Sequence, residues 1–267
     1  MSAKEMSHIK QRSDLRPEKS MPWLVASTDI PSFQHEPLVS NKLIFHLSKS
    51  YNLNFTSKIA TFLPFCPDLN SLAPVKNQGE NSKACTSYAI ASALEDRLLL
   101  GTPSIELPIS PLYAHFCIAG KPINSGWDPK ESMRALKTAA LARETAFDRE
   151  QLPAQCEARS GVVRLSNISP VNGDADARNR LLLGPVIAVM ELYEDFQSKD
   201  YRGELYRHQS GRFGGYHTVE VVGYDSMGWV VKNSFGPEWG DQGFGRVAFG
   251  ECRLFKHYSF SFQPELV

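Results

Sequence analysis

Three side chains in this sequence have the chemistry for nucleophilic catalysis: Cys85, His217 and Asn233. A cysteine attacks as its thiolate, so it needs a base that takes the proton, and the base needs an acceptor that holds its ring in one tautomer. A thiol, an imidazole and an amide supply these roles in this order along the chain. A lone cysteine is more often a small buried apolar side chain, and a single histidine at a strand start is usually structural. The prediction therefore depends on the three residues meeting in the fold.

The segment that leads to Cys85, VKNQGENSKA, is a polar loop by composition, and the segment after it, AIASALEDRLLL, favours a helix. Cys85 is thus expected in the first turn of a helix, where unpaired N–H groups and a partial positive charge favour a thiolate. The side-chain amide of Gln78 and the backbone N–H of Cys85 could both donate to the oxygen of an attacked amide. Loss of one such oxyanion donor typically raises the barrier by about 3 kcal/mol.

The elements that must position these residues divide the chain into a helical half and a strand half. Helices are predicted after Cys85, after the cap pair Ser110-Pro111, after Asp128-Pro129 and over ADARNRLLL, with 151–173 interpreted as loop. Beyond Pro185, four short runs rich in β-branched and aromatic residues are typical of strands: PVIAVME, HTVEVVGY, GWVVKNSF and GFGRVAFG. The last run mimics a dinucleotide-binding fingerprint, but no helical pattern follows it. This order predicts an α+β fold with a cleft between the two halves.

Composition sets further limits. Lys+Arg and Asp+Glu both number 29, so the net charge is zero and gives no support to a nucleic-acid or anionic-membrane partner. The cysteine count is odd and no C-x-x-C occurs, so we expect neither a metal or redox pair nor a disulfide framework of secreted type. No histidine has metal-ligand spacing, and no metal or cofactor is expected. Without an apolar run of signal-peptide or membrane-spanning length, the expected location is cytoplasmic, or exported without a classical signal peptide.

Longer blocks around these residues resemble the papain family (clan CA) of cysteine peptidases. The blocks are VKNQG, GYHTVEVVGY and VVKNSFGPEWGDQGFGRV, and the resemblance runs from about Pro64 to about Gly250. It implies a papain-like two-lobed α+β fold, with a helical left lobe, an antiparallel β-barrel right lobe and the active-site cleft between them. It also implies a monomeric thiol peptidase that hydrolyses peptide bonds of a peptide or protein substrate through an acyl-enzyme.

The same resemblance assigns roles to individual residues. It makes Cys85 the nucleophile, His217 the acid and base, Asn233 the orienter of the ring and Gln78 an oxyanion donor. It assigns substrate contacts to a second group: Gly126, Trp127, Tyr216, Thr218 and Trp239. Within this group, Gly126 would hydrogen-bond an extended substrate through its backbone, and Trp239 would shield the site.

Several positions depart from the family pattern. Gln78 and Cys85 are seven positions apart, where the family usually has six, and Thr86 replaces a tryptophan, as in bacterial members. Phe235 replaces another tryptophan but is still able to cover the Asn–His pair. Glu220 falls where the family strand is apolar, and it requires a partner such as Lys232 or an arginine. Two alternatives therefore stay open: another acyl transfer such as deamidation on the same scaffold, and a catalytically impaired binding protein with a displaced oxyanion donor.

Residues 1–63 are interpreted as an N-terminal extension to a peptidase domain of residues 64–267. The extension lacks the helical signature of the family's inhibitory segments, yet Pro22-Trp23-Leu24-Val25 and the cluster from Leu43 to Phe55 are too apolar to stay in water. We expect part of it to pack on the catalytic body. The Trp23 region is then expected near the cleft as a removable block, which would make the chain a zymogen; the alternative is that the whole segment is structural and blocks nothing.

Overall fold

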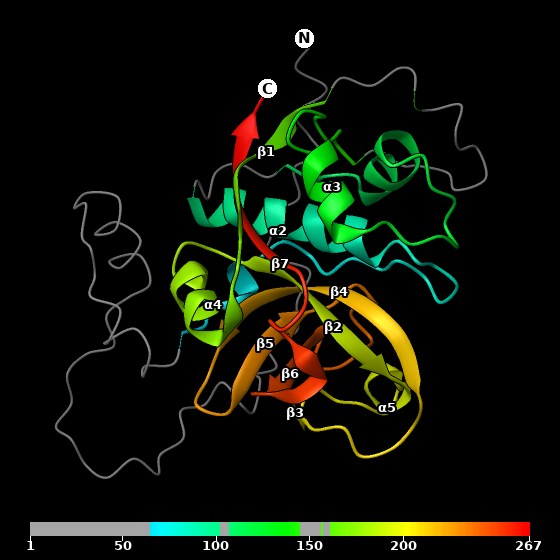
Figure 1. Ribbon diagram of the computed structural model, residues 1–267, viewed down its shortest axis with the longest axis vertical. Coiled ribbons are helices and arrows are strands. Elements are labelled where there is room, and N and C mark those ends of the chain that lie inside the picture. Colours follow the sequence, from blue (N-terminus) through cyan, green and yellow to red (C-terminus); the bar gives the residue numbers. More distant parts are fainter. Residues whose placement is uncertain (1–64, 102–106, 145–155, 157–160) are drawn as a thin grey trace, which may run out of the picture. The chain divides into compact units, whose positions relative to one another are not determined.

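The computed structural model describes residues 65–101, 107–144, 156 and 161–267. Every described residue belongs to one compact unit. The predicted extension 1–63 lies outside the described residues. In the described part, helices dominate up to residue 135 and strands dominate after residue 163, which is the α+β order that the sequence predicts (Figure 1).

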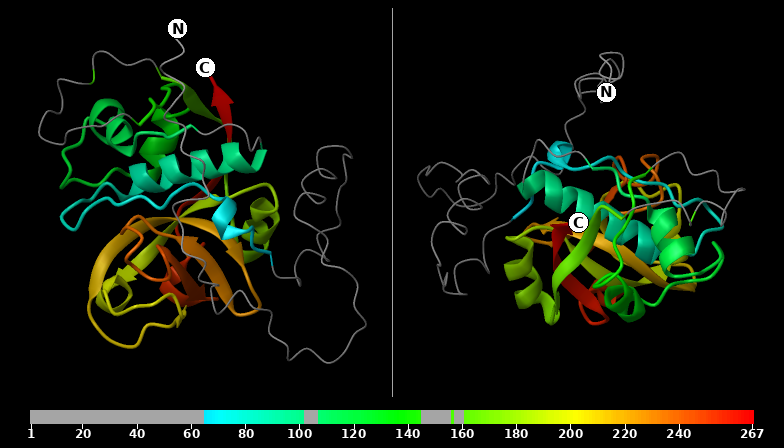
Figure 2. Two further views of the ribbon diagram at one scale, coloured as in Figure 1. Left: turned by 180° about the vertical axis from the view of Figure 1, so that it is seen from behind. Right: turned by 90° about the horizontal axis from the view of Figure 1, so that it is seen from above.

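The central helix α2 spans Cys85–Gly101 and begins at the cysteine, as predicted. Every residue from Thr86 to Leu99 is buried, so the helix has no solvent-facing side over that length. It packs against strand β4 on one side and against the shorter helices on the other (Figure 2). A helix that is covered all round needs no polar face, which explains why its apolar residues show little periodicity.

The other helices are short. The pair Ser110-Pro111 starts a helix, with the Tyr113 N–H donating to Ser110 Oγ at 3.0 Å, but Tyr113–Ile118 continues as a π-helix, η3. Helix α3 (Pro129–Ala135) is capped by Asp128, as predicted, although it ends sooner than its apolar pattern indicates. The remaining helical elements are η2 (Leu69–Ser71), α4 (Gly173–Leu181), α5 (Glu194–Gln197) and η4 (Glu251–Arg253).

In the part of the chain that the structure describes, seven strands form one sheet in the order β1-β7-β2-β4-β5-β6-β3. All neighbouring pairs are antiparallel except β3 and β6, which are parallel. The strands are β1 (Val163–Pro170), β2 (Val186–Tyr193), β3 (Leu205–Tyr206), β4 (Phe213–Tyr224), β5 (Gly228–Lys232), β6 (Phe244–Ala248) and β7 (Ser259–Leu266). The four predicted runs correspond to β2, β4, β5 and β6, so the glycine-rich run GFGRVAFG is a strand and not a nucleotide-binding turn.

The interpretation of 151–173 as loop is wrong for Val163–Pro170, which forms β1, and strands β3 and β7 were not predicted. Strand β1 has an irregular burial pattern and pairs with β7 through a register shift between Ser166 and Ser169. Its conformation is set by the partner strand, which lies almost a hundred residues further on. A local periodicity cannot report such a long-range pairing.

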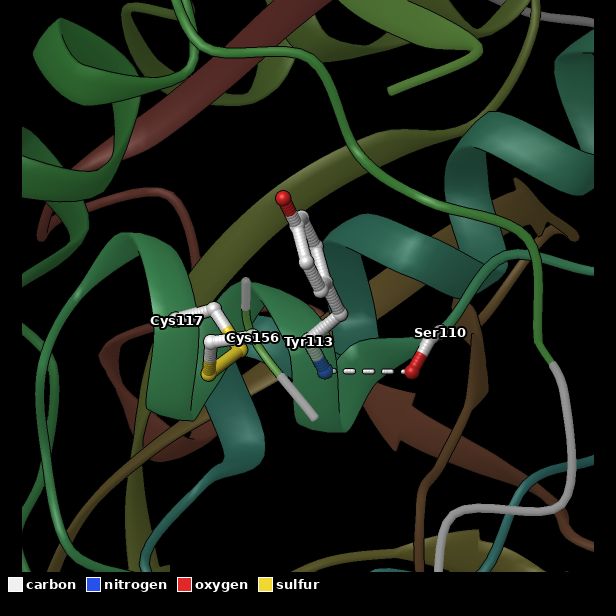
Figure 3. The surroundings of a disulfide bond; sticks show 4 residues. All are labelled: Ser110, Tyr113, Cys117 and Cys156. Carbon is white, nitrogen blue, oxygen red and sulfur yellow. Dashed lines mark hydrogen bonds between the residues drawn. A yellow bond between two sulfur atoms is a disulfide. The ribbon is translucent and has the colours of Figure 1, made fainter. Parts of the chain in front are cut away.

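A disulfide joins Cys117, in η3, to Cys156, with their Cα atoms 5.3 Å apart (Figure 3). The sequence analysis expected no disulfide framework of secreted type, and it did not predict this single crosslink. The two residues are 39 positions apart, so only the fold brings them together. Because disulfides persist mainly in oxidising compartments, the cysteine pattern no longer argues for a reducing one.

Candidate active site

The structure brings Cys85 and His217 together across the boundary between α2 and the sheet. Cys85 is half-buried at the first residue of α2, and His217 lies on β4, where it is 3% exposed. Their side chains are hydrogen-bonded to each other. A hydrogen bond between Thr86 Oγ1 and Thr218 Oγ1, at 3.0 Å, joins the next residue of each element. The thiol and the imidazole are therefore held by two neighbouring contacts between the same helix and strand.

Asn233 follows the last residue of β5 and fixes the tautomer of the His217 ring. Its Oδ1 atom lies 2.8 Å from His217 Nε2 and accepts the Ser234 N–H at 2.8 Å. A backbone N–H can only donate, so the Asn233 atom between these two groups is the carbonyl oxygen. Nε2 must then carry a proton and donate it to Oδ1. The other ring nitrogen, Nδ1, is left for the thiol of Cys85.

The pair changes the proton affinity of both partners. Burial by itself would raise the pKa of the Cys85 thiol, but the hydrogen bond and charge of His217, together with hydrogen bonds from Thr218, lower it to about 7. Burial would likewise lower the pKa of His217, and hydrogen bonds to Cys85 and Asn233 with the Cys85 charge raise it instead. Both shifts favour a thiolate beside an imidazolium, which is the reactive form of such a pair.

Two aromatic residues cover the imidazole. The Phe235 ring stacks on His217 with centroids 4.8 Å apart and an interplanar angle of 26°. Trp239 packs edge-on against Phe235 at 5.8 Å, and its indole N–H donates to the Phe196 carbonyl at 2.9 Å. Phe235 thus lies directly over the histidine, and Trp239 supports it from behind. This cover keeps water from the hydrogen bond between His217 and Asn233.

The loop that carries Gln78 is tied to the segment after Asn233. The Gln78 N–H donates to the Ser234 carbonyl at 2.8 Å, and Ser234 Oγ donates to Gln78 Oε1 at 2.6 Å. The side-chain nitrogen Nε2 donates to Ser82 O at 2.8 Å. The amide of this 4%-exposed residue is therefore held at both ends. The longer spacing between Gln78 and Cys85 is absorbed in a turn, with Ser82 N–H donating to Gly79 O and Gly79 at φ 84°.

The residues predicted to bind substrate lie in three different settings. Gly126 is exposed next to the loop that precedes Cys85, where Lys83 N–H donates to Ile123 O at 2.7 Å. Thr218 is buried beside the thiol, whereas Tyr216, two residues earlier and nearer the start of β4, is 63% exposed. Trp127 and Trp239 are 5% and 4% exposed and belong to the packed cores. Of these residues, Thr218 lies beside the thiol and Gly126 lies near the loop that precedes it, while little of either tryptophan is open to a ligand.

Sequence reasoning missed two contributions. Ser234 clamps Gln78 from the far side of the site, and Thr218 hydrogen-bonds the thiol as well as lining the site. Within the described ranges, no group of three or more acidic, histidine or cysteine side chains has a metal-binding arrangement. None of the helices that the structure describes combines the length and apolar character that a bilayer requires.

The fold and this site define a class of α+β proteins in which a helix-borne thiol meets an imidazole and an amide from a sheet. Residues 67–262 match the family model described as papain family cysteine protease. The chain belongs to this family.

Known relatives agree with that assignment. The chain is 29% identical over 191 residues to Cathepsin B-like CP3 of Giardia intestinalis, covering 65% of this chain and 63% of the relative. It is 28% identical over 200 residues to Cathepsin B-like CP2 of the same organism, covering 67% and 66%. The chain thus spans just under two thirds of the length of both relatives. The solved structure of proCathepsin B S9 from Trypanosoma congolense has the same fold, with a TM-score of 0.62, 24% identity and coverage of 76% and 77%.

Proposed function

We propose that the protein is a cysteine peptidase that cleaves peptide bonds through a covalent acyl-enzyme. The observation that carries the proposal is the chain of contacts from Cys85 to His217 to Asn233, with both pKa shifts favouring the ion pair. Membership in a family described by the same activity supports it.

The reaction follows from the positions of these groups. The Cys85 thiolate attacks the carbonyl carbon, and the π electrons of the C=O bond move to the oxygen. The Cys85 N–H and an amide N–H of Gln78 stabilise this oxyanion. His217 then gives its Nδ1 proton to the leaving nitrogen, the C–N bond breaks, and a thioester remains. In the second half, His217 removes a proton from water, the hydroxide attacks the thioester, and the thiolate leaves with the acid product free.

The experiment compares the unaltered chain with Cys85→Ala, His217→Ala and Asn233→Ala on a peptide library read by mass spectrometry. Cys85→Ala should abolish cleavage and labelling by an epoxide thiol probe. His217→Ala should lose roughly as much, and Asn233→Ala should lose less, since an orienting group acts through the base. Full turnover by Cys85→Ala, or labelling at Cys66 or Cys252 instead, would show that the nucleophile is misassigned.

The same library separates peptide cleavage from the two alternatives. Deamidation would appear as a gain of about one dalton without chain cleavage, because the acyl-enzyme forms from a side-chain amide. A binding protein without catalysis would give neither product. The clamped Gln78 amide favours catalysis over this last alternative, since the longer loop still holds the donor at both ends.

We also propose that the substrate carries an apolar residue, such as Leu, Val or an aromatic, two positions before the scissile bond. The residues that the resemblance assigns to this pocket include Trp127, Tyr216 and Thr218, none of which carries a charge. A fluorogenic library varied at that position tests the proposal. A dominant preference for Arg or Asp would refute it.

A further inference from the structure

Glu220 is a carboxylic acid in a place where a strand would ordinarily carry an apolar residue. It lies three residues after His217 on β4 and is completely buried. It shares its side of the strand with Thr218, which contacts Thr86 of α2. Its carboxyl group faces the side chains of Asp96 and Ser92 in α2. This side chain therefore lies between the strand that carries the imidazole and the helix that carries the thiol.

A buried ion pair lies next to Glu220. Lys232, the last residue of β5, is the register partner of Glu220, and its ammonium lies 2.7 Å from Asp96 Oδ2. The two charged side chains are 1% and 0% exposed. Asp96 belongs to α2, and its other oxygen accepts the Ala73 N–H at 2.5 Å. Side chains from α2, β4 and β5 therefore meet in one buried cluster of Asp96, Glu220 and Lys232.

The charges of this cluster balance only if Glu220 is neutral. The single positive charge of Lys232 is already matched by Asp96, and a second carboxylate would leave an unmatched charge out of contact with water. Burial accordingly raises the pKa of Glu220 well above its usual value, the Asp96 charge raises it further, and Lys232 opposes the shift. The other groups that face it are Ser92 and Arg97 of α2 and the apolar Ile187 of β2.

Arg97 does not act as a second cation that would match an ionised Glu220, because its guanidinium is already hydrogen-bonded to other groups. It donates to the carbonyls of Pro185, Gly184 and Leu183 and to Ser261 Oγ, at 2.8 to 3.2 Å. These bonds fix the C-terminal part of α2 to the entry of β2 and to β7. The cluster is therefore a second, separate attachment of the helix, between the Arg97 bonds and the thiol.

The cluster is placed so that it affects all three active-site residues. Asp96 lies in the helix that begins at Cys85, about 16 Å along its axis at the usual rise per residue. Lys232 directly precedes Asn233, and Glu220 follows His217 on the same strand. Buried ion pairs contribute little to stability compared with apolar packing, and fixing the register of two elements is their best-attested role.

We propose that Asp96, Glu220 and Lys232 form a buried positioning unit that holds helix α2, and with it Cys85, in register with the strands that carry His217 and Asn233. Protonated Glu220 has one O–H, which it can direct to the Asp96 carboxylate across the boundary. The role rests on the proposed function, because positioning matters only if the thiol and imidazole act together. Its test, however, reads the reactivity of the thiol and not cleavage.

The test measures alkylation of Cys85 by iodoacetamide as a function of pH, with the labelled peptide identified by mass spectrometry. The other free thiols compete poorly, because burial and nearby carboxylates raise the pKa of Cys66 and of Cys252 to about 12. Full-length variants Asp96→Asn, Glu220→Asp and Glu220→Gln are compared with the unaltered chain. Glu265→Gln, which removes a carboxylate paired with Arg164 on the surface, is the matched control.

Asp96→Asn and Glu220→Asp should raise the midpoint of alkylation by about one pH unit, which lowers the rate at pH 7 about fivefold. The first removes the partner of Lys232, and the second retracts the carboxyl by one methylene. Glu220→Gln keeps the length and a donor without a charge, so its rate should stay within about twofold of the unaltered rate. Glu265→Gln should have no effect.

Unaltered midpoints in Asp96→Asn and Glu220→Asp, with helical circular dichroism retained, would overturn the proposal. If Asp96→Asn does not fold, the two Glu220 variants decide: a Glu220→Gln rate as low as that of Glu220→Asp would also overturn it. A chain that cleaves no peptide but shows the predicted alkylation shifts would keep the positioning unit and reject the proposed function. The two proposals therefore fail separately.

Discussion

At the scale of single residues, the site depends on how Cys85 and His217 change each other's protonation. Each would be neutral at its own buried position, because burial disfavours the charged form of both. Together they exchange a proton, and the charges stabilise each other. Asn233 determines which ring nitrogen takes part in this exchange, since its carbonyl oxygen keeps Nε2 protonated and leaves Nδ1 facing the thiol.

This coupling predicts a pH dependence. The pKa of Cys85 is lowered from 9.0 to about 7, so the thiolate is present above pH 7 and is lost as the pH falls through that value. The pKa of His217 is raised from 6.5, so its imidazolium persists to higher pH than an exposed histidine would allow. Activity and alkylation by iodoacetamide should therefore both decline as the pH falls below about 7.

His217→Ala provides the control for that prediction. It removes the hydrogen bond and the charge but leaves the burial, so the alkylation midpoint of Cys85 should move upward by about two units, to its ordinary value or above. At pH 7 the rate should then fall about fiftyfold. A midpoint that stays near 7 in His217→Ala would mean that the end of α2, and not the histidine, sets the thiol's acidity.

The residues of this site were largely predictable from the sequence, but the side chains that hold them in place were not. Cys85, His217, Asn233 and Gln78 stand in segments whose composition and resemblance predict their roles. Trp127 was expected to contact substrate, and in the structure it is buried among the residues packed on α2. Lys232 is the strand neighbour of Glu220, as expected, but its ion pair with Asp96 and the Ser234 clamp depend on long-range packing that no spacing along the chain reports.

At the scale of elements, the Gln78 loop is held in place by the segment that follows β5. The Gly236 N–H donates to Lys76 O at 3.2 Å, and Asn77 forms an isolated bridge with Phe235. Gly236 has a φ of 87°, and a Cβ atom there would lie 2.8 Å from Asn77 Nδ2. Asn77 Oδ1 in turn accepts the Gly79 N–H at 2.8 Å, so its amide cannot move without disturbing the turn next to Gln78.

Gly236→Ala should therefore reduce both stability and catalysis. The left-handed conformation costs about 1–2 kcal/mol for alanine, and the contact with Asn77 should add about 1 kcal/mol or more. Displacement of Gln78 should lower kcat more than it changes KM, because an oxyanion donor acts in the transition state. Urea unfolding and steady-state kinetics on one peptide substrate measure the two effects.

Gly250→Ala is the matched control for Gly236→Ala. Gly250 has the same φ of 87°, but nothing lies within 4 Å of a Cβ atom there. Gly250→Ala should therefore lower the free energy of unfolding only by the cost of the left-handed backbone conformation, and its kcat should stay unchanged. Equal kinetics in the two variants would show that the loop after β5 does not position Gln78.

The elements were predictable where their pattern is local. The caps at Ser110 and Asp128 predicted helix starts, and the β-branched runs predicted β2, β4, β5 and β6. Strand β1 was missed because its residues, VRLSNISP, have no regular alternation and take their conformation from β7. The π-helix over Tyr113–Ile118 was missed because the first-turn signals of an α-helix and a π-helix are alike.

At the scale of the whole molecule, the disulfide between Cys117 and Cys156 ties η3 to a residue 39 positions away. A crosslink of this length should stabilise the fold by about 4 kcal/mol through loss of chain entropy in the unfolded state. The double variant Cys117→Ser/Cys156→Ser should lower the free energy of unfolding by roughly that amount.

Urea unfolding measures this loss, and both chains should carry Cys85→Ala so that a reactive thiol does not exchange with the disulfide. The reduced parent chain serves as a second reference and should unfold at the same urea concentration as the serine variant. Coinciding midpoints for the oxidised parent and the serine variant would contradict a stabilising role.

The described body begins at Phe65, which is joined to the end of β4. Phe65 N–H donates to Tyr224 O at 2.9 Å, and Tyr224 N–H donates to Phe65 O at 2.6 Å. A Cβ atom at Gly223 would lie 2.5 Å from Phe65 O, so the glycine is required for this close approach. A truncation that stops before this residue therefore leaves the attachment intact and tests residues 1–63 alone.

Faster turnover of a small peptide substrate by a chain that begins at Pro22 or by one that begins at Val39, compared with the full chain, would support a block of the cleft by the removed residues. A block competes with substrate, so kcat/KM should rise and the alkylation rate of Cys85 should rise with it. Urea midpoints equal to that of the full chain would show that the gain does not come from altered folding. If Leu43–Phe55 instead completes the core, a chain that begins after Phe55 should unfold at lower urea concentration, because apolar contacts are lost. Equal kcat/KM and alkylation rates in the full chain and both longer truncations would remove the block.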